Sequence, residues 1–344
     1  MAGDKKSINL QILNILKEHS DVNNRLSQTE IKEYLEREYD QVGIDGRTIN
    51  ANIDILNEYL DGAIDYRIEK MKSKGSMIEK RYDYYIEREF DESELRLLID
   101  SILSSKTIPE NQSYQLIEKL RNEASLNFKY KKNMIKKYTS GLKLNDELFT
   151  SIEVLAEAIE EHKKVKFNYY DYNINKKLVP RTKDNTVREY IMTPLRMVVN
   201  SGRYYVFGVP DAYNDLSPYR IDKIKGAEKL DETGKKKEDI NGLKDGLDLG
   251  KHIAEHIFMT IGPSDTIIFE FNPYWISSVI DWFGKDIELK MKDDKICIGR
   301  IKVNIQSFEN WAMMCSYTNV KVISPKSVIE DIKKRIEAIS NLYR

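Results

Sequence analysis

The chain is poor in cysteine, in histidine and in long apolar runs. Its 344 residues include two cysteines, Cys297 and Cys315, which lie in apolar contexts and form no metal-ligand spacing. So few cysteines favour a reducing compartment, and we expect a cytoplasmic protein without a disulfide framework. No segment approaches the roughly 20 consecutive apolar residues of a membrane span, and the N-terminus lacks the apolar core of a signal peptide. We therefore expect no membrane partner.

Net charge is also close to zero, because 55 basic and 56 acidic residues leave −1 at pH 7. A chain with this balance does not carry positive charge over its whole surface, so DNA binding would require a local basic patch. The sequence also lacks a phosphate-binding glycine loop, a nucleophile elbow and a pair of catalytic carboxylates. We therefore expect no enzyme activity and no cofactor.

One string resembles a metal-binding motif. Residues 252–256 read H-I-A-E-H, with His252 and His256 at the two ends. The pattern H-x-x-E-H occurs in some zinc peptidases, because histidines at i and i+4 share a helix face. The chain holds four histidines, and the other two, His19 and His162, fall in other predicted domains. No third ligand lies near the pair, so a short connecting helix explains it better and we expect no metal site.

The first 60 residues predict a helix-turn-helix. Apolar side chains recur at helical spacing over 7–19, 27–38 and 45–59, and the second segment opens with a capping box. A short turn containing Gly43 joins the last two predicted helices, which is typical of the motif. Two strand-like runs, 63–69 and 80–88, then flank a Gly-Ser loop and predict a basic hairpin.

The third predicted helix is the candidate DNA-reading element. Arginine and asparagine make paired hydrogen bonds to guanine and adenine edges, and we place these side chains opposite the inward-facing Ile49 and Ile53. Lysines of the hairpin loop would contact phosphates. The alternative is a solvated polar face on an ordinary helical bundle. The predicted DNA-binding residues are Arg47, Thr48, Asn50, Asn52, Lys72 and Lys74.

Beyond the hairpin, residues 91–124 predict a helical connector split at Pro109, and 128–143 form a basic segment that we interpret as a hinge. After a helix at 151–162, turn signals separate five short strands that predict a small barrel: 165–172, 188–193, 195–200, 203–209 and 219–224. A polar, Gly-punctuated linker is predicted at 231–250. The remainder reads strand-helix-strand-strand-helix-strand, which is the ferredoxin-like order.

The order of several sequence blocks resembles the WYL-domain transcriptional regulators. The blocks are LAEAI (155–159), VKFNY (165–169), TPLRMV (193–198), GRYYVFG (202–208), YRIDKI (219–224), FENWAMMC (308–315) and VKVISPKSV (320–328). The namesake Trp-Tyr-Leu stands here as Tyr204-Tyr205-Val206. The third predicted helix departs from the family pattern, because Arg47–Ile53 lacks its second arginine and its aspartate. An operator sequence therefore cannot be carried over from the family.

The resemblance implies a ligand-sensing pocket, in some members for nucleotides or single-stranded DNA. Arginine offers a planar fork to phosphate, aromatic rings stack on bases, and few acids lie in the same sequence blocks to neutralise the cations. The alternative is that tyrosines fill the barrel and arginines line its rim. The predicted ligand-binding residues are Tyr169, Arg196, Arg203, Tyr204, Tyr205, Tyr219, Arg220 and Lys223.

Together these observations predict an α+β multidomain protein. Its parts are a winged helix-turn-helix (1–90), a helical connector (91–150), a small Sm-like β-barrel or WYL domain (151–230) and a ferredoxin-like, WCX-like dimerisation domain (251–344). Trp275, Trp282 and Trp311 concentrate apolar area in the last part, where we expect dimer contacts.

We expect a ligand-responsive repressor that binds an inverted-repeat operator as a homodimer. The resemblance implies control of a defence-related operon. The alternative is an accessory nucleic-acid-binding module that recruits a nuclease or helicase.

Overall fold

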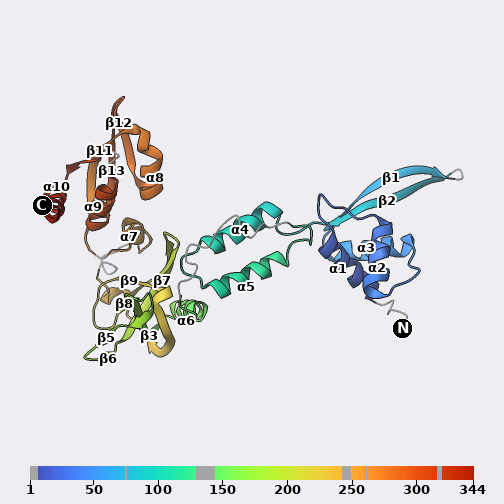
Figure 1. The fold of residues 1–344 in the computed structure, drawn as a ribbon, viewed down its shortest axis with the longest axis horizontal. Coiled ribbons are helices and arrows are strands. Elements are labelled where there is room, and N and C mark those ends of the chain that lie inside the picture. The colour runs from blue at the N-terminus through green and yellow to red at the C-terminus, as the bar shows by residue number, and fades with distance from the viewer. Residues whose placement is uncertain (1–6, 74–75, 129–143, 242–248, 261, 316–319) are drawn as a thin grey trace. The chain divides into compact units, whose positions relative to one another are not determined.

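The computed structural model describes all residues except 1–6, 74–75, 129–143, 242–248, 261 and 316–319. The chain divides into two compact units, Met1–Gly141 and Leu142–Arg344 (Figure 1). Each unit combines helices with antiparallel strands, so the chain has a mixed α/β architecture. Among the described residues, no helix is long and apolar enough to cross a membrane.

The described part of residues 7–60 folds into the helices α1 (Ile8–His19), α2 (Gln28–Tyr39) and α3 (Gly46–Tyr59), each within one residue of its predicted bounds. The capping box is present at the start of α2, where the Ser27 amide donates to the Glu30 carboxylate at 2.7 Å. Side chains from the three helices share one core, in which the fully buried members include Ile12, Ile15, Ile31, Leu35, Ile49 and Ile53.

An antiparallel hairpin of β1 (Ile64–Ser73) and β2 (Ser76–Ile86) follows α3. The prediction placed residues 70–79 in a loop, but the pairing continues to Ser73 and Ser76, so the predicted loop was too long. An ion pair between Lys70 and Glu79 (3.6 Å) favours this extension, because opposite charges directly across an antiparallel pair stabilise it.

The segment predicted as a split connector forms two helices, α4 (Glu92–Ser104) and α5 (Glu110–Arg121), and Pro109 stands at the N-cap position of α5. The two helices share a small core that also includes Phe128: Leu95, Ile99, Leu103 and Ile117. The rest of the predicted basic hinge, 129–143, lies outside the described residues.

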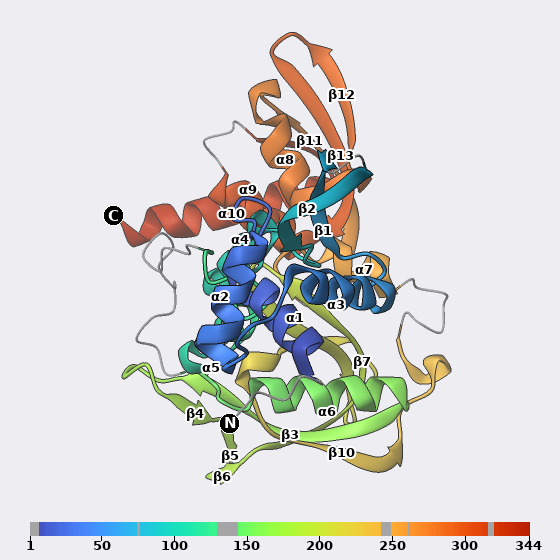
Figure 2. The same ribbon diagram turned by 90° about the vertical axis from the view of Figure 1, so that its right-hand side faces the viewer.

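The second unit begins with α6 (Leu148–Glu160) and an antiparallel sheet in the order β10-β3-β7-β8-β9, with β4 beside β3 and β5 paired with β6. The strands are β3 (Lys163–Tyr172), β4 (Leu178–Pro180), β5 (Thr182–Lys183), β6 (Thr186–Val187), β7 (Glu189–Asn200), β8 (Arg203–Pro210), β9 (Ser217–Arg220) and β10 (Ile224–Thr233). Figure 2 shows α6 along β3 and β10, on which it packs.

Two strand predictions in this unit were wrong. Residues 188–193 and 195–200 form the single strand β7, with a register shift between Pro194 and Arg196. The predicted strand 219–224 is instead the end of β9, the 3-10 turn η2 (Ile221–Lys223) and the start of β10.

The sheet is nevertheless curled in a barrel-like manner. Its two edge strands, β9 and β10, are joined by the three-residue turn η2, so the sheet must bend to bring its edges near each other. No pairing closes β9 onto β10 among the residues that the structure describes, and the sheet is therefore open there.

The remaining residues form α7 (Leu249–Glu255) and a sheet in the antiparallel order β12-β13-β11-β14 with helices between its strands. The elements are β11 (Ser264–Phe271), α8 (Ile276–Phe283), β12 (Glu288–Asp293), β13 (Ile296–Asn304), α9 (Ile305–Met314), β14 (Lys321–Ser324) and α10 (Lys326–Leu342). The predicted succession of strands and helices is present.

The three tryptophans belong to the core of this sheet. Trp311 is 1% exposed, and its ring lies 4.7 Å from that of Phe283. Trp275 and Trp282 are half-buried against the same core. Trp311 is therefore used within the chain, and the expectation of dimer contacts in this domain stays a prediction.

Candidate nucleic-acid and ligand sites

The first turn of α3 presents an exposed polar surface. Asp45 caps the helix, since its carboxylate accepts a hydrogen bond from the Thr48 amide at 2.8 Å, and this bond lowers the pKa of Asp45. Arg47 is exposed directly after the cap, and Ala51 is exposed one turn later. The cap therefore fixes the helix start from which Arg47 projects.

Asn50 does not face outward, and that part of the prediction was wrong. Its side-chain oxygen accepts hydrogen bonds from Gln28 Nε2 (2.9 Å) and from the hydroxyl of Tyr84 (2.8 Å). Tyr84 is fully buried, and burial raises its pKa. Asn50 therefore ties α3 to α2 and to the hairpin, which is a structural task.

Asn52 is also engaged, because its Nδ2 donates to the Thr48 carbonyl at 2.8 Å within the helix. Further along α3, Asp54 forms an ion pair with Arg81 of β2, whose guanidinium lies 4.6 Å from the centre of the Tyr66 ring. This pair holds the hairpin against α3. Of the predicted α3 residues, Arg47 is the exposed cation that can reach a ligand.

The basic side chains along the described hairpin are largely paired. Arg67 lies 3.2 Å from Asp83, in addition to the Lys70–Glu79 and Arg81–Asp54 pairs. Lys74 lies outside the described residues, and Lys72 is placed through its backbone pairing with Met77. Among the described side chains of the hairpin, Lys80 is a further exposed cation.

In the second unit, Asp222 organises the predicted arginines. Two nitrogens of Arg220, Nε and Nη2, donate to the two carboxylate oxygens of Asp222 at 3.0 and 2.5 Å. Arg203 Nη1 lies 3.7 Å from the same carboxylate, whose side chain is 2% exposed. The argument that these cations lack compensation was therefore wrong.

A second acid, Asp171 at the end of β3, compensates Lys223. Its carboxylate also accepts a hydrogen bond from Arg181 Nε at 2.6 Å. Burial alone would raise the pKa of Asp171, but the bonds from Lys223 and Arg181 outweigh it and lower the pKa. Sequence reasoning missed Asp171 because β3 meets the start of β10 only through strand pairing, and it missed Arg181 because that residue follows β4, which pairs with β3.

Tyr169 and Tyr219 are packing residues of this unit. Together with Phe167 and Tyr190 they form a ring cluster in which the Tyr169 and Tyr219 centres are 5.4 Å apart. The Tyr169 hydroxyl accepts from the Arg220 amide at 3.2 Å, and burial raises the pKa of Tyr169 to about 12. Tyr169 and Tyr219 therefore fill the barrel, as the alternative interpretation of the sequence had it.

Other side chains leave positive charge and aromatic edges at the surface. Arg196 is exposed and forms no ion pair with a residue that the structure describes, while Tyr204 and Tyr205 are half-buried on β8. Arg181 and Arg188 lie over the rings of Tyr169 and Tyr190, at 4.9 and 4.6 Å from their centres. Sequence reasoning missed both arginines, although they flank a short polar hairpin next to the predicted strands.

The N-terminal unit holds helices and a hairpin, and the second unit holds a curled sheet in which the buried Asp222 carboxylate binds two arginines. Residues 150–229 match the family model of the WYL domain, as the sequence blocks in that part of the chain predict.

A search of curated proteins found no match. Among solved structures, the proteasome accessory factor B/C (PafBC) of Arthrobacter aurescens is similar at 14% identity and a TM-score of 0.26, over 98% of this chain. The chain spans 49% of the length of that PafBC chain.

Proposed function

We propose that this chain is a ligand-responsive transcriptional regulator that binds double-stranded DNA, and that it is not an enzyme. The N-terminal unit would act as a winged helix-turn-helix. In support, α2 and α3 are consecutive helices with a common core, and the hairpin follows them. Leu26 and Tyr84 exchange two backbone hydrogen bonds of 2.8 Å, which adds the short third strand expected beside a wing.

The observation that carries this proposal is the exposed, capped start of α3. Recognition helices contact base edges mainly through their N-terminal residues. Arg47 is exposed there on a helix that the Asn50–Tyr84 bond holds rigidly against the hairpin. Glu58, near the other end of α3, is exposed and would repel phosphates. We therefore orient the first turn of α3 into the major groove, with Lys72 and Lys74 on the flanking backbone.

The WYL domain is the proposed sensor, for a nucleotide or a short single-stranded nucleic acid. Arg196, Arg181 and Arg188 supply exposed cations, and Tyr204 and Tyr205 supply partly exposed rings for stacking. Arg220 is oriented by its two bonds to Asp222, keeps 21% of its side chain exposed and retains further N–H donors. Arg203 and Lys223 remain members of this proposed site.

We also propose that the regulator is a homodimer whose C-terminal domain is ferredoxin-like, corresponding to the WCX extension. The strand order β14-β11-β13-β12 supports that fold. Along α10, Ile332 packs on the core of its own domain, whereas Ile336 and Ile339 continue the same stripe and are 51% and 45% exposed. Alternating spacings of four and three residues suit pairing with the same helix of a second copy.

A two-fold dimer would match an inverted-repeat operator. Cytoplasmic action as a repressor of a defence-related operon is supported by the family resemblance.

The test is selection of duplexes from a randomised library by the full chain, followed by competition binding. We expect one enriched motif with two-fold symmetry. Arg47→Ala should bind it little better than a scrambled duplex. The matched control Arg121→Ala, which removes a half-buried cation of α5 paired with Glu118, should retain the preference. Failure to enrich any motif would refute the regulator and leave the accessory nucleic-acid-binding module as the explanation.

A further inference from the structure

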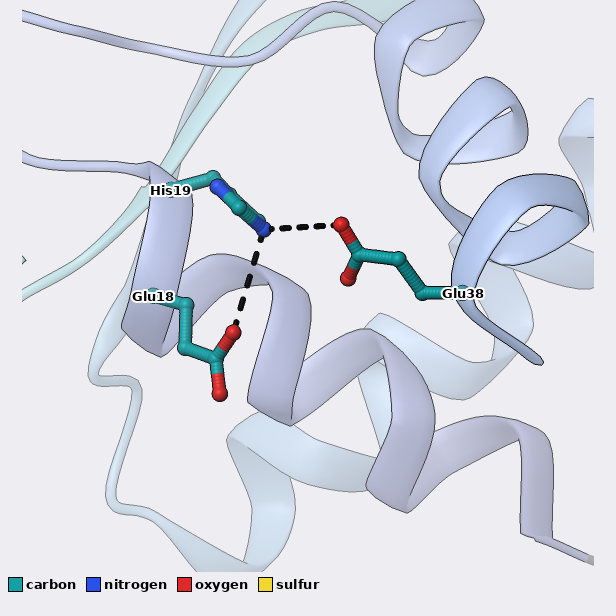
Figure 3. A group of neighbouring side chains, drawn as sticks. All are labelled: Glu18, His19 and Glu38. Carbon is teal, nitrogen blue, oxygen red and sulfur yellow. Dashed lines mark ion pairs between the residues drawn. The ribbon is translucent and has the colours of Figure 1, made fainter. Parts of the chain in front are cut away.

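Three potential metal ligands converge at the ends of α1 and α2. Glu18 and His19 lie in the last turn of α1, and Glu38 lies in the last turn of α2 (Figure 3). One ligand atom from each side chain lies within 4.8 Å of the others. Figure 3 shows the imidazole Nε2 directed between the two carboxylates. Glu38 comes from a different helix, which explains why no sequence motif indicated this group.

The distances suit a tetrahedral metal ion. His19 Nε2 lies 3.2 Å from Glu38 Oε1 and 3.8 Å from Glu18 Oε2. Zinc bonds of about 2.0–2.2 Å to nitrogen and oxygen place adjacent tetrahedral ligands about 3.3–3.6 Å apart. The two separations from His19 bracket this range and the carboxylate oxygens lie within 4.8 Å of each other, so side-chain rotations would bring the three ligand atoms to coordination distance.

The histidine is held in place by its neighbours. Its ring stacks on Tyr34 with 3.9 Å between centroids and a 16° interplanar angle. Nε2 is buried, and it has no hydrogen-bond partner within the described part of the chain despite the short approach to Glu38. The Glu38 oxygen therefore does not lie along the direction in which an N–H group at Nε2 would point. This geometry is expected of a ring nitrogen that is directed at a point between the two carboxylates.

The charges also fit a divalent cation. Two carboxylates and a neutral imidazole together neutralise one M²⁺, and this mixed nitrogen–oxygen set is one that zinc accepts. Arg37 Nη2 lies 3.0 Å from Glu38 Oε1. Arg37 therefore occupies one lone pair of Oε1. The second lone pair of Oε1, or Oε2 of Glu38, remains available to the metal.

We propose that Glu18, His19 and Glu38 bind one zinc ion, with water in the fourth position, and that the ion clasps the C-terminal ends of α1 and α2. Residues that follow the connector helices contact the C-terminal end of α1 at the same place. The carbonyls of Glu18 and His19 accept hydrogen bonds from the Leu126 amide (2.8 Å) and from Asn127 Nδ2 (3.2 Å). Zinc would therefore stabilise the junction between the helical core and the connector. This inference does not depend on the proposed DNA binding.

The experiment is calorimetric titration of the chelator-treated full chain with zinc, repeated with Co²⁺ to record its visible absorption. We expect binding of one ion at this site and a tetrahedral Co²⁺ spectrum. Glu38→Gln and His19→Gln should each weaken binding by more than about tenfold. The matched control Glu36→Gln, an exposed acid on the same helix, should bind as the wild type does.

The pair His252 and His256 provides the competing site, and a double His252→Gln, His256→Gln variant separates the two. Retention of zinc by this variant, together with its loss in Glu38→Gln, supports the proposal. The proposal is overturned if the wild type binds no zinc, or if binding is lost with His252 and His256 and survives in Glu38→Gln. Circular dichroism of each variant distinguishes loss of a ligand from loss of the fold.

Discussion

Arg220→Ala should destabilise the WYL domain strongly, because Arg220 is the principal partner of a buried carboxylate. The side chain of Asp222 is 2% exposed, and after the substitution its remaining partner is Arg203 at 3.7 Å. Removing one member of a buried ion pair costs about 3–5 kcal/mol. Arg220 is 21% exposed and Arg203 remains, so we expect the lower end, about 3 kcal/mol. For a unit of this size the loss corresponds to a fall in Tm of about 6–12 °C.

Calorimetry and urea unfolding measure this loss, with Arg196→Ala as the matched control. Arg196 is exposed and has no ion pair with a described residue, so its removal should change the free energy of unfolding by less than about 0.5 kcal/mol. Replacing both partners, as Arg220→Met with Asp222→Leu, should recover most of the stability, because neither charge is then buried alone. Equal stability of Arg220→Ala and the wild type, or strict additivity in the double variant, would refute this reasoning.

The other predictions concern α3, α10 and Asp171. Asn50→Ala should cost about 1–3 kcal/mol of unfolding free energy, because the buried Tyr84 hydroxyl loses its acceptor, although Gln28 Nε2 still donates to that hydroxyl at 3.0 Å. Arg47→Ala should spare stability but reduce discrimination between duplexes by about 1–3 kcal/mol. Urea unfolding and competition binding measure the two effects, and indistinguishable variants would show that the reading residue is misassigned. The double variant Ile336→Glu, Ile339→Glu should convert a dimer into a monomer in light scattering, whereas the exposed control Lys333→Glu should not. An unchanged mass of the double variant would contradict the pairing of α10 with the same helix of a second copy. Asp171→Asn should lower stability by at most about 1 kcal/mol, since the pair is partly exposed. The pKa of Asp171 is lowered in the folded state, so this contribution is present above the unfolded value of about 3.9 and is lost as pH falls through the folded value. Unfolding curves measured from pH 7 to pH 3 test this, and a wild-type advantage that stays constant over that range would count against it.

The helices could be predicted because their signals are local. Isoleucines and leucines at helical spacing, together with the Ser27–Glu30 capping box, place α1, α2 and α3 within one residue of their bounds. The strand β10 was harder to predict. Its sequence IKGAEKLDET is mostly polar, as suits an edge strand that is buried mainly at Ile224, and its last residues were included in a predicted linker.

The candidate sites were predicted less completely, because their partners are distant in sequence. Asp171 meets Lys223 across 52 residues, and Tyr84 meets Asn50 across 34. Helical periodicity placed Asn50 on the outer face, but α2 and the hairpin pack against that side. The cations of the YRIDKI block were recognised, whereas one of the two acids that neutralise them was not. Local sequence composition does not reveal such pairs, since strand pairing brings them together.

The most direct test of DNA recognition is a salt titration of the full chain on its selected duplex and on a scrambled duplex, by fluorescence anisotropy. If the dimer makes about 6–10 phosphate contacts, affinity should fall about 10³–10⁵-fold between roughly 50 and 200 mM salt, and the selected duplex should remain the tighter at each concentration. Equal Kd values for the two duplexes together with a flat salt response would contradict the proposal that this protein reads DNA through α3 and its hairpin.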